Sequence, residues 1–195
     1  GRRLATLTEQ LKRGIEECDG LLSNNEMFLA RTKGIGTISG EDALDFGMTG
    51  PSLRASGILE DVRISEPYSI YERFNFGIPV GTAGDCYDRY YVRVEEMRQS
   101  LSIIEQAVQQ MEEGPILANV RRITRPPKGE VYIRTESPRG DFGVYLVSDG
   151  SDKPYRVKVR APSFANLQTL QHLLRDAYVA DSVVILGSID IVLGE

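Results

Sequence analysis

The segment 85–113 reads DCYDRYYVRVEEMRQSLSIIEQAVQQMEE and carries the strongest structural pattern in the chain. Its apolar residues recur at alternating steps of three and four, which places them on one face of an α-helix: Tyr87, Tyr90, Val94, Met97, Leu101, Ile104, Val108 and Met111. Asp85 is a suitable N-cap, and Gly114 followed by Pro115 ends the pattern. We therefore predict a long helix over 85–113. It is more typical of a helix bundle than of a coiled coil, because only one such segment exists.

The remaining charges of this segment suggest no site by themselves. The carboxylates fall between the apolar positions and are interpreted as the solvated face of the helix: Glu95, Glu96, Glu105, Glu112 and Glu113.

The region before the long helix contains shorter helical patterns. Apolar residues from Leu4 to Cys18 recur at helical spacing, and that helix should end near Gly20. A second short helix is predicted within 21–30. Ser39, with Asp42 three residues on, predicts the start of a further helix that closes at Gly47. From there to residue 84 the chain is rich in Gly, Pro and aromatic residues, which indicates an ordered loop.

The pattern changes to a strand-like alternation after the long helix. Segments 131–134, 142–147 and 155–159 predict a small antiparallel sheet, with a turn at Asp149-Gly150. Pro162 and Ser163 then open another helix, and the chain ends on an apolar stretch, 183–193. The predicted fold class is α+β and mainly helical.

Composition limits the functional classes. The chain has 195 residues, 41% of them hydrophobic and 26% charged, which is ordinary for a globular domain. Its longest apolar run, 183–186, is far too short to cross a bilayer. The net charge of −5 argues against nucleic-acid binding. Cys18 and Cys86 form no Cys-x-x-Cys pair and are expected to be reduced, buried thiols. Because Gly1 is followed at once by a helical pattern, we interpret residues 1–195 as a single fragment of a larger domain.

The residues alone indicate no active site. His172 is the single histidine, so neither a metal site nor serine–histidine catalysis is expected. Gly34-Ile35-Gly36 lacks the spacing of a dinucleotide fingerprint, so bound NAD is not expected. Two segments, 50–57 and 136–140, place Arg54 and Arg139 beside Gly and Pro in constrained turns. There a guanidinium can fork onto carbonyls, carboxylates or a neighbouring subunit, and a structural or interface role is predicted for both.

Five blocks in one order carry a resemblance that covers nearly the whole chain. They are Thr49–Gly57 (TGPSLRASG), Gly84–Arg98 (GDCYDRYYVRVEEMR), Glu136–Gly140 (ESPRG), Pro154–Phe164 (PYRVKVRAPSF) and Leu186–Glu195 (LGSIDIVLGE). In them the chain resembles the C-terminal half of the large quinone-site subunit of NADH-quinone oxidoreductase, respiratory complex I. That family is related to the large subunits of nickel-iron hydrogenases, whose C-terminal-half fold is therefore expected. Hydrogenases hold nickel with a Cys-x-x-Cys pair near the tail, where this chain has Asp190 to Leu193, so no metal is expected.

The resemblance implies a part in quinone reduction without a bound cofactor. The family member packs against a smaller subunit that holds the terminal iron-sulfur cluster, and the two enclose the cavity for the quinone, which is the substrate of the complex. NADH is oxidised elsewhere in this proton-translocating assembly. Asp190, Val192 and Ile191 match tail positions that line the cavity. The family's headgroup-contacting Tyr and His lie upstream, so the fragment alone is expected to be inactive.

The resemblance also implies where the subunit lies in the cell and that a segment of the chain is missing. The subunit is expected to lie peripherally at the cytoplasmic face of the bacterial inner membrane, or on the matrix side in mitochondria, held through the complex and its other peripheral-arm subunits. The family normally carries a further helical segment near 123–128, so this junction is interpreted as a deletion or a missing loop. It separates a helical part, 1–122, from the sheet, helix and tail of 129–195.

Two other functions stay open at this point. One is a hydrogenase-like large subunit of a ferredoxin-linked complex, which the missing cysteines disfavour. The other is a purely structural scaffold for partner subunits.

Overall fold

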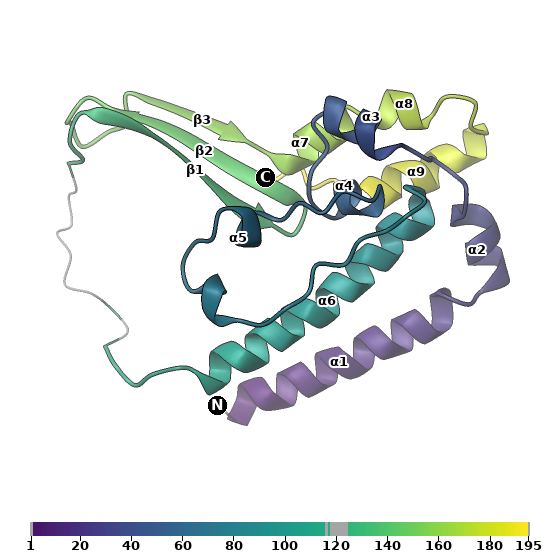
Figure 1. Ribbon diagram of the computed structural model, residues 1–195, viewed down its shortest axis with the longest axis horizontal. Coiled ribbons are helices and arrows are strands. Elements are labelled where there is room, and N and C mark those ends of the chain that lie inside the picture. Colours follow the sequence, from purple (N-terminus) through teal and green to yellow (C-terminus); the bar gives the residue numbers. More distant parts are fainter. Residues whose placement is uncertain (1, 116, 118–124, 195) are drawn as a thin grey trace.

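A computed structural model describes residues 2–115, 117 and 125–194 of the chain. Two long helices, α1 (Arg2–Leu22) and α6 (Cys86–Gln109), lie side by side and run in opposite directions (Figure 1). The connection between them forms short helices: α2 (Glu26–Thr32), α3 (Gly40–Asp45), α4 (Gly50–Ala55), α5 (Val62–Ser65) and one 3₁₀ turn, η1 (Tyr71–Arg73).

A three-stranded sheet follows and extends away from the two long helices (Figure 1). Its strands are β1 (Gly129–Ser137), β2 (Gly140–Ser148) and β3 (Arg156–Arg160), paired antiparallel in the order β1-β2-β3. The chain then forms α7 (Pro162–Leu167), α8 (Leu170–Leu173), a 3₁₀ turn, η2 (Val179–Asp181), and α9 (Ser182–Ile189). The predicted α+β class, with one long helix and a small antiparallel sheet, is confirmed. Positions 123 and 124 of the predicted junction lie outside the described residues.

The long helix begins where the sequence predicts and ends earlier. The Asp85 carboxylate accepts a hydrogen bond from the backbone N–H of Asp88, at 2.8 Å, and so caps α6. The helix ends at Gln109 instead of Glu113. The residues beyond it are exposed, Met111 to 69%, so no packing compensates the cost of continuing the helix.

Helix α6 buries two faces instead of one. Its buried residues include Cys86, Arg89 and Val92, which lie off the predicted apolar stripe. The helix packs against α1 on one side and against α4 and α9 on another. Met97 and Ile104, which belong to the stripe, remain 44% and 39% exposed.

The predicted loop between residues 47 and 84 contains two helices that the sequence pattern missed. Helix α4 has only six residues, too few for a helical period to be recognised, and all six are buried. Pro51 stands in its first turn, where a missing N–H costs nothing. The prediction of buried thiols holds for Cys86 and is wrong for Cys18, which is exposed; both cysteines are free.

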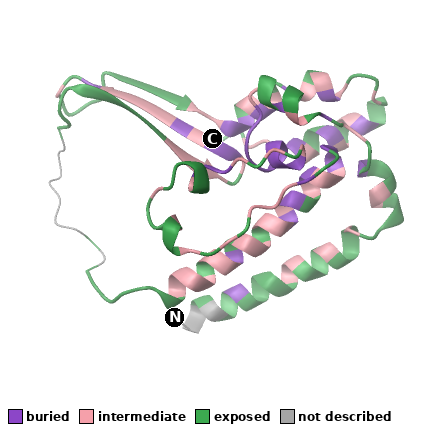
Figure 2. Ribbon diagram, in the orientation of Figure 1, coloured by how far each residue is buried: buried purple, intermediate pink, exposed green. Residues whose placement is uncertain are grey.

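The core lies where α3, α4, α8, α9 and the start of α6 meet. Its buried side chains are Ile38, Ala43, Met48, Leu53, Cys86, Leu173, Ile185 and Ile189. By contrast, much of α1 and of the outer strands is exposed (Figure 2).

One face of the sheet is aliphatic. The strand register aligns two rows across it, Ile133–Val144–Val159 and Val131–Leu146–Val157. Among these residues Val131, Ile133, Val157 and Val159 are 46%, 58%, 48% and 44% exposed.

The β1–β2 turn and the start of α4 touch through two glycines. A Cβ on Gly140 would lie 2.6 Å from the backbone nitrogen of Gly50, and one on Gly50 would lie 2.4 Å from the Cα of Gly140. Both residues have positive φ, +129° and +65°. This backbone contact brings the segments that carry Arg54 and Arg139 together.

Gly140→Ala should therefore destabilise the chain strongly. The left-handed backbone costs about 1–2 kcal/mol for a residue with a Cβ, and the clash with the Gly50 backbone adds to it, so we expect a loss above ~2 kcal/mol in urea unfolding. Gly150→Ala is the matched control: φ is +91°, but the nearest atom to its Cβ is the flexible Lys128 Cγ at 3.5 Å, so only the backbone term should appear. Equal losses of unfolding free energy in both variants would show that the close contact between Gly140 and Gly50 is not required for stability.

Candidate functional site

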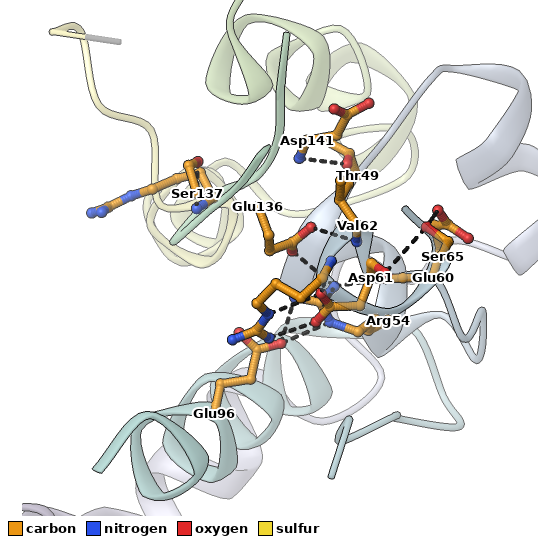
Figure 3. Close-up of polar contacts among 12 residues, drawn as sticks. Thr49, Arg54, Glu60, Asp61, Val62, Ser65, Glu96, Glu136, Ser137 and Asp141 are labelled. Atoms are coloured by element: carbon orange, nitrogen blue, oxygen red, sulfur yellow. Dashed lines mark hydrogen bonds and ion pairs between the residues drawn. The ribbon is translucent and has the colours of Figure 1, made fainter. Parts of the chain in front are cut away.

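Arg54 is a deeply buried charge, with a side chain 1% exposed. It leaves α4 toward α6 and β1 (Figure 3). Its Nε donates to Glu96 Oε1 at 2.7 Å, and its Nη1 donates to Glu136 Oε1 at 3.0 Å and to the Glu60 carbonyl at 2.7 Å. One guanidinium thus joins α6, β1 and the segment before α5.

Two further charges complete what we call the Arg54 cluster: Arg54, Asp61, Arg63, Glu96 and Glu136. Asp61 caps α5 and binds Arg63, whose backbone N–H and Nε both donate to Asp61 Oδ1 at 2.9 Å. Asp61 Oδ2 lies 3.7 Å from Arg54 Nη1. Glu136 Oε2 accepts the backbone N–H of Val62 at 3.2 Å.

Burial and ion pairing act in opposite directions on the two glutamates of the cluster. Burial raises the pKa of Glu96 and of Glu136, because the charged form loses its water, while the guanidinium of Arg54 acts to lower both pKa values. Burial has the larger effect, so the pKa of each glutamate is raised above its usual value of 4.5.

A second group of charges holds the C-terminal tail. Helix α9 ends at Ile189, and its C-cap residue Asp190 adopts a left-handed conformation with φ of 57°. Arg139 Nη2, from the β1–β2 turn, donates to Asp190 Oδ1 at 3.2 Å, and Arg93 Nε lies 3.7 Å from Asp190 Oδ2. Arg93 Nη2 also donates to the carbonyl of Ile189, at 3.1 Å, and to Ser52 Oγ, at 3.0 Å. Burial lowers the pKa of Arg93 to about 10.

Buried amide and hydroxyl groups fix the β1–β2 turn beneath this tail. Asn166 Oδ1 accepts the backbone N–H of Thr49 at 2.9 Å, and Asn166 Nδ2 donates to the carbonyl of Arg139 at 3.2 Å. Thr49 Oγ1 accepts the backbone N–H of Asp141 at 2.9 Å. Helix α7, the start of α4 and the turn are therefore joined by directional bonds.

Two cavities flank the tail. Cavity 1, of about 420 Å³, is mainly apolar and is lined by Phe28, Thr32, Cys86, Tyr90, Val94, Val184, Gly187 and Ser188. Cavity 2, of about 450 Å³, is more polar and is lined by Arg63, Tyr71, Glu96, Ser100, Glu136, Ser137 and Pro138. Arg93, Met97 and Asp190 line both. The Arg93–Asp190 pair therefore stands between an apolar and a charged cavity.

The predicted site residues occupy three different environments. Asp190 lines both cavities and binds Arg139. Ile191 packs against the core, while Val192 is half-buried and its backbone N–H donates to Ser163 Oγ at 3.2 Å. Neither lines cavity 1 or 2. Arg54 lies in its buried cluster, of which Arg63, Glu96 and Glu136 reach the wall of cavity 2.

Arg93 was not predicted as a site residue, and Glu96 lies in a different environment from the predicted one. The interpretation of Glu96 as part of a solvated face is wrong, since its side chain is 16% exposed and binds Arg54. Arg89, Arg93 and Glu96 recur at helical spacing on the face of α6 away from the apolar stripe. That row of charges was available in the sequence, but solvated faces have the same appearance.

No cluster of three or more His, Cys, Asp or Glu within 2–115, 117 and 125–194 is arranged to hold a metal ion. Over the same residues, none of the helices combines the length and apolar character needed to span a bilayer.

Arg54→Met should destabilise the chain by about 3–5 kcal/mol, because it leaves two buried carboxylates without their cation. Urea unfolding at neutral pH measures the loss. Arg13→Met is the matched control, since Arg13 and Glu17 form an ion pair whose side chains are 73% and 70% exposed, and such pairs contribute roughly 0–1 kcal/mol. A loss below ~1 kcal/mol for Arg54→Met would contradict the role given to the cluster.

Glu136→Gln should change how stability depends on pH. The folded-state pKa of Glu136 is raised, so its contribution is complete below the unfolded value of 4.5 and is lost as the pH rises through the folded value. Relative to the Gln variant, the unmodified chain should therefore lose stability as the pH increases. Glu66→Gln is a control of opposite sign, because a hydrogen bond from Arg134 lowers the pKa of Glu66. Parallel pH profiles for the unmodified chain and Glu136→Gln would refute this.

Comparison with known proteins identifies the family. A family model described as the respiratory-chain NADH dehydrogenase 49 Kd subunit matches residues 2–128 and 120–195. An NADH-quinone oxidoreductase subunit of Desulforamulus reducens is 51% identical over 193 residues, which are 99% of this chain and 53% of that protein. The subunit of the same name from Carboxydothermus hydrogenoformans is 53% identical over 182 residues, 93% of this chain and 50% of that protein.

A third relative gives the same result. The subunit of that name from Clostridium beijerinckii is 47% identical over 192 residues, 98% of this chain and 52% of that protein. The chain thus spans about half the length of the curated relatives it matches. With matches over nearly all of its residues, the chain belongs to the family of the 49 Kd subunit of the respiratory-chain NADH dehydrogenase.

Proposed function

We propose that this chain forms part of the quinone-binding cavity of a proton-translocating NADH:quinone oxidoreductase, beside the terminal iron-sulfur cluster of a partner subunit. The observation that carries the proposal is the position of Asp190. This residue belongs to the C-terminal tail, whose sequence resembles that of the family, and it lines both cavities. Family membership supports the assembly, since the matched relatives are named as subunits of this oxidoreductase.

The apolar wall of cavity 1 and the charged groups around Asp190 are proposed to contact different parts of the quinone. Cavity 1 offers a largely hydrocarbon wall, which suits the ring and isoprenoid chain of a quinone. Arg93 and Arg139 place two guanidiniums around one carboxylate, that of Asp190. Hydrogen-bond donors and positive charge in this position favour the electron-rich oxygens of a quinone as it is reduced.

Ile191 and Val192 are proposed as the continuation of the cavity wall toward the partner subunit. Ile191 packs against the core and the backbone of Val192 binds Ser163, so both residues of the tail are held in place. Arg54 and Arg139 are proposed to act structurally, Arg54 through its cluster and Arg139 by fixing the orientation of Asp190.

This chain is proposed to bind no cofactor of its own. Electrons would come from the cluster of the partner subunit, and NADH would be oxidised elsewhere in the complex. The chain would lie peripherally at the membrane, on the cytoplasmic or matrix side, through its partner subunits.

Asp190→Ala combined with Val192→Met should lower quinone reduction by the assembled complex at least about tenfold, equivalent to ~1.4 kcal/mol of lost transition-state stabilisation. NADH oxidation with an artificial acceptor should be unchanged, because the electron-input steps do not involve the tail. Val183→Met, at a position on α9 that is 77% exposed and lines neither cavity, is the control. Normal quinone turnover in the double variant would rule out the tail assignment.

A further inference from the structure

Glu96 is bound on one side only. Its Oε1 accepts a hydrogen bond from Arg54 Nε at 2.7 Å, and Arg54 Nη2 lies 2.6 Å from the same oxygen as an ion pair. Among the described residues, Oε2 has no hydrogen-bond donor, and Glu96 belongs to the lining of cavity 2. A residue that lines the cavity thus keeps one carboxylate oxygen without a donor.

Glu136 provides the contrast within the same cluster. Its Oε1 accepts from Arg54 and its Oε2 accepts the backbone N–H of Val62, so both oxygens are occupied. Protonating Glu136 would break one of these bonds, whereas a proton on Glu96 Oε2 would leave the contact with Arg54 intact. The two carboxyls differ in this respect although both are buried.

The charges around Glu96 balance when every group is ionised. Four guanidiniums and four carboxylates, Glu96 included, come from the elements that pack here: Arg54 on α4, Asp61 and Arg63 at the start of α5, Arg93 and Glu96 on α6, Glu136 on β1, Arg139 in the β1–β2 turn and Asp190 at the tail. Without Glu96 the other seven groups carry one excess positive charge, which favours the ionised form of Glu96. The loss of water on burial acts in the opposite direction and has the larger effect, so the pKa of Glu96 is raised.

We propose that Glu96 is a proton-exchanging group of cavity 2, which takes up a proton on Oε2 and releases it into the cavity that Asp190 also lines. This inference rests on the proposed function and extends it to the source of a proton. Two-electron reduction of a quinone takes up two protons, with the electrons supplied by the partner's cluster. The O–H bond of Glu96 breaks, an O–H bond forms on a quinone oxygen by way of intervening water, and the Glu96 carboxylate regains its proton from solvent.

The size of cavity 2 supports transfer through water. At about 450 Å³ it has room for several molecules, since each takes about 30 Å³ in the liquid. Its lining supplies the polar partners that such water needs, including Ser100, Ser137 and the three carboxylates. Cavity 1, with its largely apolar wall, offers no comparable path.

The first test is a carboxyl-carbon NMR titration of the 195-residue chain, which requires neither quinone nor partner subunit. Glu96 should titrate above 4.5, and Asp61→Asn should shift its midpoint downward, since the Asp61 charge acts to raise the pKa of Glu96. Glu66, whose pKa is lowered by Arg134, is the internal control. A Glu96 midpoint at or below 4.5 would overturn the proposal. Because the unmodified chain is titrated, a misfolded variant does not prevent this result.

The second test uses the assembled complex. Glu96→Gln should reduce quinone reduction about tenfold or more, as expected for loss of a positioned proton donor, and should remove one ionisation from its pH profile. Glu96→Asp should restore part of the rate and the ionisation, whereas Glu112→Gln, at an exposed position, should change neither. An unaltered pH profile in Glu96→Gln would refute proton exchange. If Asp190→Ala with Val192→Met were also without effect, the quinone site itself would be misplaced.

Discussion

A guanidinium almost without access to water requires carboxylates from its neighbours, and Arg54 obtains them from α6 and β1. Removing such a charge from water costs several kcal/mol, which is offset only when its donors find partners in good geometry. The positions of α4, α6 and β1 are therefore interdependent, although they are far apart in the sequence. The glycine contact between α4 and the β1–β2 turn allows this arrangement, because any side chain there would separate the two segments.

Arginines also replace regular secondary structure in the long connection between α2 and α6. The buried Arg89 donates from Nη1 to the carbonyl of Gly84 and from Nη2 to that of Gly36, each at 2.8 Å. Its Nε reaches Ser188 on α9 at 2.9 Å. Carbonyls that have no strand or helix partner are thus satisfied from the side of α6. Because α6 also carries Arg93 and Glu96, the helix that fixes the loops also places the charges at the two cavities.

The sequence was sufficient for the elements with a clear period. The long helix, its cap at Asp85, the cap at Ser39 and the three strands all follow from local rules. Helix α4 was missed because a helix of six buried residues shows no amphipathic period. The burial of Glu96 could not be predicted, since its partner Arg54 is 42 residues away and the charge pattern of a buried ion pair resembles that of a surface.

The geometry of the candidate site, like the burial of Glu96, could not be predicted from local sequence. The tail was located by its resemblance to a family, but which of its residues line a cavity depends on the left-handed turn at Asp190. That turn directs the carboxylate toward Arg93 and Arg139 while Ile191 returns to the core. No local sequence rule would have predicted that the adjacent side chains of Asp190 and Ile191 lie in such different environments.

The aliphatic face of the sheet affects how the chain behaves in concentrated solution. Two rows of branched side chains, with four members about half exposed, lie on strands of which β1 and β3 are sheet edges. Unpaired strand edges beside apolar side chains promote self-association into intermolecular sheets. The chain on its own should therefore aggregate through this sheet before it loses its helical core. Charged residues introduced at positions 133 and 157 would oppose this aggregation.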